Sequence, residues 1–130
     1  MSDSHWPHFS RSELSCHCPC GQMEMDPDFM LRLEELRTAF GKPMRITSAY
    51  RCPSHNAQAS STGFTGPHTT GLAVDVAISG QDAHELLTLA LHQGFNGVGI
   101  SQRGPHNKRF IHIDAIDNGP GRPRPTVWSY

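Results

Sequence analysis

Two short segments of this chain of 130 residues place a histidine and a carboxylate in apolar surroundings. The first segment holds His68 and Asp75, and the second holds His112 and Asp114. Two imidazoles and one carboxylate, with a fourth position left open, are a common ligand set for catalytic zinc. Such an ion polarises a carbonyl group and lowers the pKa of water. The spacing alone also allows Asp75 to be a satisfied core carboxylate, with the histidines at caps or on the surface.

The strands that must position these residues are predicted from side chains that alternate between two faces, with a period of two residues. Asp75 then lies on one strand face between small alanines, which leave room for a ligand. A carboxylate in such an apolar run is costly to bury unless it is paired or bound to a metal. His112 and Asp114 share a face of the last strand by the same argument. If the two strands pair, His112 lies close to Asp75, and His68 folds over the strand's start.

The remaining pattern predicts an α+β domain with a small, mostly antiparallel sheet and helices packed on one side. A helix begins after Asp26 at its N-cap and ends at Gly41. The segment 52–66 has no apolar periodicity and is expected to be a long loop. The other elements expected are an irregular lead-in at 1–25, strands at 44–51, 72–78, 97–101 and 110–116, a helix at 83–92, and an irregular tail at 117–130.

Length and charge limit the number of domains and the kinds of partner to expect. One domain over residues 1–130 fits this length, and we expect a monomer. The net charge of −1 gives no reason to expect nucleic acid or an anionic membrane as a partner. No apolar run reaches the length of a membrane-spanning helix, and the first residues lack the pattern of a secretory signal peptide. We therefore expect synthesis in the cytoplasm.

Four cysteines form a second group of possible ligands. Cys16, Cys18 and Cys20 follow one another closely, and Cys52 is distant in the sequence. The set is compatible with a structural zinc, for which His17 is a spare ligand, although the spacing is not the usual Cys-x-x-Cys. Reduced thiols, or one or two disulfides in an oxidising compartment, are the other interpretations.

Residues 68–75 read His-Thr-Thr-Gly-Leu-Ala-Val-Asp and resemble the His-x-x-Gly-x-Ala-x-Asp signature of the M15 zinc peptidases. These are D-alanyl-D-alanine carboxypeptidases, dipeptidases and peptidoglycan endopeptidases. Three further segments agree in order: Thr-Ser-Ala-Tyr-Arg at 47–51, the glycine-rich run at 94–100, and Phe-Ile-His-Ile-Asp at 110–114. The resemblance spans roughly residues 9–130, is greatest to the short M15 branch, and implies a fold shared with hedgehog signalling domains.

The resemblance implies Zn²⁺ bound by His68, Asp75 and His112, with Arg51 binding substrate or stabilising the oxyanion. It implies a metallopeptidase that cuts peptidoglycan stem peptides or cross-links as a carboxypeptidase or endopeptidase. Such an enzyme acts at the cell wall, encoded by a phage or released by another route. The alternative is a catalytically inactive, zinc-stabilised module that binds the cell wall or a protein.

Two positions depart from the family pattern. Gly66 stands where many members have serine, and Arg109 stands where several relatives keep an acidic catalytic residue. Arg109 cannot act as a base. Asp114 is the first candidate for the general base, and the alternative role for it is to orient a ligand. The loop histidines His106 and His55 are the next candidates.

Overall fold

The computed structural model describes residues 6–130 and has a five-stranded sheet at its centre, with strand order β1-β2-β4-β3-β5. The strands are β1 (Arg45–Ser48), β2 (Ala73–Ala77), β3 (Gly97–Ser101), β4 (Phe110–Asp114) and β5 (Thr126–Ser129). Three of the pairings are antiparallel, and only the pairing of β3 with β5 is parallel. The predicted α+β fold with a mostly antiparallel sheet is confirmed.

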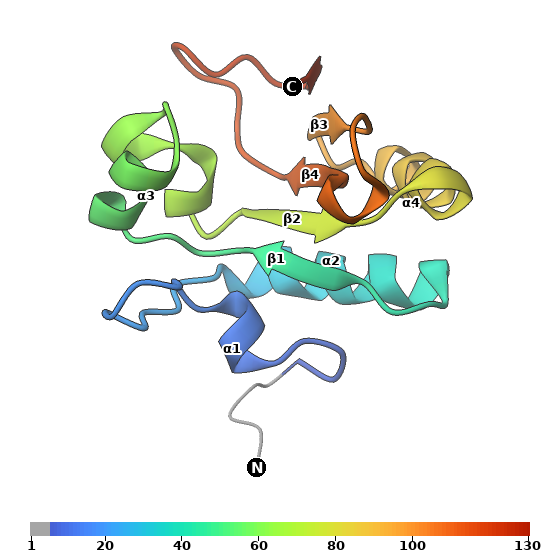
Figure 1. Ribbon diagram of the computed structural model, residues 1–130, viewed down its shortest axis with the longest axis horizontal. Helices are drawn as coiled ribbons and strands as arrows, with labels where there is room; N and C mark the ends of the chain where they lie inside the picture. The colour runs from blue at the N-terminus through green and yellow to red at the C-terminus, as the bar shows by residue number, and fades with distance from the viewer. Residues whose placement is uncertain (1–5) are drawn as a thin grey trace.

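Helices lie against one face of this sheet and at one of its ends, as Figure 1 shows. The helices are α1 (Arg11–Leu14), α2 (Pro27–Phe40), α3 (Pro53–Ala59) and α4 (Gly80–His92), with short 3₁₀ turns η1 (Gly63–Thr65), η2 (Pro67–Thr69) and η3 (His106–Lys108). The α2 helix has the predicted ends. The Asp26 side chain accepts a hydrogen bond from the Phe29 N–H at 2.9 Å, and Gly41 closes the helix with a φ of 72°.

The two faces of the sheet differ in character. One face sends Val74, Val76, Ile111 and Ile113 into an apolar core shared with the buried residues of α2 and α4. The opposite face carries the polar residues of β2 and β4, because side chains alternate along a strand. This division leaves one face of the sheet free for chemistry while the other holds the fold together.

The segment 52–66 is not the long loop expected from the sequence, because it contains α3 and η1. Buried Asn56 holds these turns together: its amide donates hydrogen bonds to the Gly63 carbonyl at 2.6 Å and to Thr62 Oγ1 at 2.9 Å. No apolar stripe marks this helix, so hydrophobic periodicity gives no sign of it. Figure 1 shows α3 at one end of the sheet.

The two ends of the chain also contain regular structure that the sequence analysis did not predict. The tail expected to be irregular forms β5, which adds to β3 in parallel. The lead-in contains α1, capped by Ser10 and Glu13 in a capping box, while residues 1–5 of the expected lead-in lie outside the described residues. Within residues 6–130, no helix combines the length and apolar character that a membrane span requires.

Candidate metal centre

Three side chains from three elements meet on the polar face of the sheet. His68 comes from η2, Asp75 from β2 and His112 from β4, where the register pairs Asp75 directly with His112. Oδ1 of Asp75 lies 3.3 Å from Nε2 of His68 and 3.0 Å from Nδ1 of His112. One ligand atom from each of the three lies within 4.8 Å of the others. The pairing of β2 with β4, which the sequence left as a condition, is present and brings these residues together.

Each imidazole is held by a hydrogen bond through the ring nitrogen that faces away from Asp75. Nδ1–H of His68 donates to the carbonyl of Ala49 at 2.7 Å, and Nε2–H of His112 donates to Oδ2 of Asp114 at 2.8 Å. In a neutral imidazole, such a hydrogen bond places the proton on this nitrogen and leaves the nitrogen that faces Asp75 to bind a metal. Two neutral imidazoles and a carboxylate, so oriented, fit the donor set of a catalytic zinc site.

The charges around Asp75 favour its ionised form. Burial raises the pKa of the Asp75 carboxyl, but its contacts with the imidazoles of His112 and His68 outweigh burial and hold that pKa below its usual value. Burial lowers the pKa of the His112 imidazole, yet its bonds to Asp114 and Asp75 raise it overall. The carboxylate is thus ready to bind a cation without first losing a proton.

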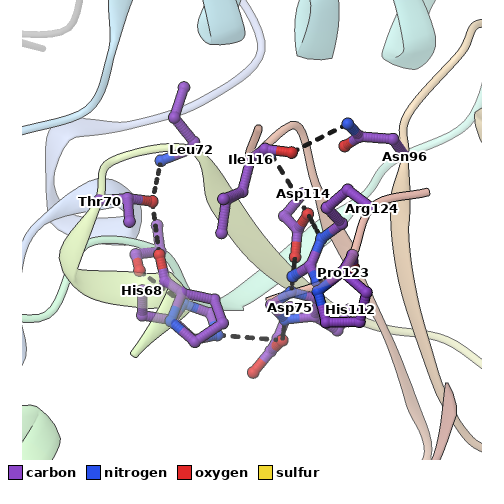
Figure 2. A network of polar contacts seen from close by, with 12 residues as sticks. His68, Thr70, Leu72, Asp75, Asn96, His112, Asp114, Ile116, Pro123 and Arg124 are labelled. Carbon is purple, nitrogen blue, oxygen red and sulfur yellow. Dashed lines mark hydrogen bonds and ion pairs between the residues drawn. The ribbon is translucent and has the colours of Figure 1, made fainter. Parts of the chain in front are cut away.

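Arg124 completes this network from the tail, and the sequence analysis did not identify it. Its Nε donates to Oδ1 of Asp114 at 2.9 Å and its Nη2 donates to Oδ2 at 2.8 Å. Figure 2 shows the resulting chain of contacts from His68 through Asp75, His112 and Asp114 to Arg124. Asp114 is fully buried and does not line the cavity described next. The geometry therefore supports the orienting role for Asp114 over the role of base.

A cavity of about 800 Å³ opens over the three candidate ligands. Its wall includes Arg51, whose Nη1 donates to Oδ1 of Asn56 at 3.1 Å and whose Nη2 lies 4.0 Å from Oδ2 of Asp75. The other lining residues come from the α3–η2 region, from β4 and from the tail: Ala59, Ser60, Ser61, Thr62, Thr65, Gly66, Pro67, Phe110, Pro120, Gly121, Arg122, Arg124, Trp128 and Tyr130.

Two glycines of β3 make room for this site. A Cβ built on Gly97 would overlap the Asp114 carboxylate, and one built on Gly99 would lie 2.6 Å from Nε1 of Trp128. Trp128 in turn packs its ring 5.1 Å from that of His112, measured between centroids. The glycine-rich strand thus admits the buried carboxylate and the aromatic side chain beside the ligands.

The remaining candidates from the sequence lie elsewhere. His106 and His55 do not line the cavity, and Nδ1 of His106 lies 3.2 Å from Oγ of Ser79, beyond the end of β2. Arg109 donates to the carbonyl of Gly104 at 3.0 Å and also does not line the cavity. Position 66 requires glycine, because a Cβ there would overlap the side chain of Thr62.

Comparison with known proteins agrees with this arrangement. The family model described as Peptidase M15 matches residues 7–114, so the chain belongs to the peptidase M15 family. Peptidases of this family depend on zinc, in keeping with the donor set found here. No curated protein and no solved structure gives a significant match. The matched residues end at Asp114, so Arg124, Trp128 and Tyr130 lie outside them.

Proposed function

We propose that this chain is a zinc-dependent peptidase that hydrolyses peptide bonds in peptidoglycan stem peptides or cross-links, as a D,D-carboxypeptidase or an endopeptidase at the cell wall. The observation that carries the proposal is the set of His68, Asp75 and His112, with both imidazoles oriented, at the wall of an open cavity. Membership of the M15 family supports the same class of reaction.

The ligands, Arg51 and Asp114 have different roles in the proposed reaction. His68, Asp75 and His112 would hold the zinc ion, which when bound polarises the scissile carbonyl and activates water. Arg51 presents a fixed cation next to this position, because Asn56 holds its guanidinium. A cation aimed at the developing oxyanion stabilises the transition state more than the ground state. Asp114 holds His112 in place and does not touch the substrate.

The cavity suits a peptide that carries free carboxylates, and peptidoglycan stem peptides are of this kind. Arg51 and Arg122 contribute cations to its wall, whereas Asp75 is its only side-chain carboxylate among the described residues. Trp128 and Tyr130 add aromatic surface along the tail side. A tyrosine hydroxyl keeps its proton at neutral pH, so that of Tyr130 is available to donate a hydrogen bond to the substrate.

One observation favours the alternative of an inactive, zinc-stabilised binding module. Within residues 6–130, the wall of the cavity has no carboxylate or imidazole besides the three candidate ligands. A separate general base of the kind expected from the sequence is therefore missing from the wall. If the chain is an enzyme, a ligand carboxylate or solvent must then remove the proton from water. This predicts slower turnover than in an enzyme with a separate general base.

Digestion of purified peptidoglycan separates these functions. Zinc-loaded protein is incubated with the polymer, with chelated protein and an Asp75→Asn variant as controls, and the products are identified by mass. Release of terminal D-alanine identifies a carboxypeptidase, and cleavage of cross-linked dimers identifies an endopeptidase. Retention of the protein on peptidoglycan without any product, at every zinc concentration, would contradict the enzyme and support the binding module.

A further inference from the structure

A second group of metal-binding side chains lies outside the cavity, formed by Cys16, Cys18, Cys20 and Cys52. The first three belong to the turn between α1 and α2, and Cys52 lies just before α3. All four are free thiols, and one Sγ atom from each lies within 4.8 Å of the others. Residues separated by more than thirty positions in sequence are thus gathered at a single point.

The spacing of these sulfur atoms matches a tetrahedral metal site. Sγ of Cys18 lies 3.4 Å from that of Cys16, 3.5 Å from that of Cys52 and 3.0 Å from that of Cys20. Sγ of Cys16 lies 3.7 Å from that of Cys52. Four thiolates about 2.3 Å from a zinc ion lie about 3.8 Å apart. Small inward or outward shifts therefore suffice to bind the ion.

Backbone N–H groups point at the same sulfurs. The N–H of Cys52 donates to Sγ of Cys16 at 3.3 Å, that of Cys20 to Sγ of Cys18 at 3.4 Å, and that of Gln22 to Sγ of Cys20 at 3.5 Å. Hydrogen bonds of this kind stabilise the thiolate, which is the form that binds a metal. Disulfides would consume the sulfurs in pairs and give no reason for all four to gather.

We infer that Cys16, Cys18, Cys20 and Cys52 form a structural zinc site separate from the catalytic one. On binding, four sulfur–zinc bonds form and the thiol protons pass to solvent. A closed set of four protein ligands leaves no open position for a substrate, so the ion acts on structure. His17, which the sequence offered as a spare ligand, is exposed and does not belong to the cluster.

The site has a consequence for the cavity because Cys52 follows directly after Arg51. The carbonyl of Ala49 accepts from Nδ1–H of His68, and the N–H of Arg51 donates to the carbonyl of His68 at 3.0 Å. The segment 49–52 thus contacts a catalytic-site ligand at one end and the cysteine cluster at the other. Zinc bound by the cysteines anchors this segment to the turn that follows α1.

The test uses full-length protein purified under reducing conditions and loaded with Co²⁺ in place of zinc. We expect two metal ions per chain by elemental analysis, and intense sulfur-to-cobalt charge-transfer absorption. Cys20→Ser, at an exposed position, is expected to bind one ion and to lose most of that absorption. His17→Ala is the matched control and is expected to keep both ions and the full absorption.

A variant of the other site makes the two proposals separable. His68→Ala is expected to lose one ion and keep the sulfur-to-cobalt absorption, so a failed catalytic site leaves this prediction intact. The inference is overturned if wild-type protein shows no sulfur-to-cobalt absorption while its four thiols react freely with a thiol reagent. Disulfides in the mass of the natively purified protein, with no metal bound by cysteine after reduction, would overturn it equally.

Discussion

Arg124 and Asp114 form a two-point ion pair that holds the tail of the chain against the last antiparallel strand. Nε and Nη2 of Arg124 donate to Oδ1 and Oδ2 of Asp114 at 2.9 Å and 2.8 Å. Oδ2 of Asp114 also accepts a 2.8 Å hydrogen bond from Nε2–H of His112, which holds that imidazole in place. A residue outside the matched family region thereby fixes a candidate zinc ligand.

Arg124→Gln is expected to destabilise the protein, because it leaves the carboxylate of Asp114 buried without its cation. Removing one partner of a buried ion pair costs about 3 kcal/mol. The free energy of unfolding in denaturant measures the effect. Arg122→Gln is the control: Arg122 lines the same cavity and forms no ion pair among the described residues, so a change within about 0.5 kcal/mol is expected. Equal stability of the two variants would contradict the role given to Arg124.

Asp114→Asn tests whether Asp114 orients His112 or acts as a base. As an orienting residue, its loss is expected to weaken zinc binding by about 10-fold to 100-fold, with activity largely restored at saturating zinc. Zinc titration and peptide hydrolysis are measured on the same preparation, with Asp117→Asn at an exposed position as the control. Unchanged zinc affinity together with lost activity at saturation would instead identify Asp114 as the base.

Arg51→Gln is expected to lower kcat/KM for a stem peptide by about 100-fold to 1,000-fold, the range for removing one oxyanion donor. Zinc content is expected to stay at the wild-type level, because Arg51 is not a ligand. Arg45→Gln removes an exposed arginine from the start of β1 and serves as the control. Full activity of the Arg51 variant would remove this residue from the mechanism.

Acid is expected to destabilise the chelated protein through Asp114. Burial raises the pKa of this carboxyl, but hydrogen bonds from His112 and Arg124 outweigh burial and hold the pKa below its usual value. The folded state then binds a proton less readily than the unfolded state. The stabilisation is complete well above the ordinary carboxyl pKa of about 4 and is lost as the pH falls through the lower folded pKa.

The measurement is the free energy of unfolding of chelated protein at a series of pH values below about 5, for wild type and Arg124→Gln. Because the variant lacks one of the groups that lower the pKa, its stability is expected to fall less steeply with acid. Identical slopes would show that Arg124 does not set the pKa of Asp114.

The strand faces and the helix ends could be predicted because their signals are local. Alternation assigned Asp75 and His112 each to one face of its strand, which brings them together if the strands pair, and the register does pair them directly. The α2 helix was predicted from its cap at Asp26 and its stop at Gly41, which are features of neighbouring residues. Such signals survive in a single sequence because the interactions that cause them span only a few positions.

Other features were missed because they depend on distant contacts. Arg124 lies in a proline-rich tail without periodicity. It reaches Asp114 only because the tail folds back and pairs with β3 through β5. The α3 helix is held by the amide of Asn56 rather than by an apolar stripe. The choice between the two roles of Asp114 likewise required its burial and its partner, which strand alternation does not supply.

Anomalous diffraction at the zinc absorption edge, from crystals of the zinc-loaded protein, tests the metal centre most directly. The account predicts a peak about 2.0–2.2 Å from Nε2 of His68, Nδ1 of His112 and a carboxylate oxygen of Asp75. It further predicts that Nε2 of His112 stays bonded to Asp114. A zinc-loaded crystal with no peak among these three residues, or with zinc on Nε2 of His112, would contradict it.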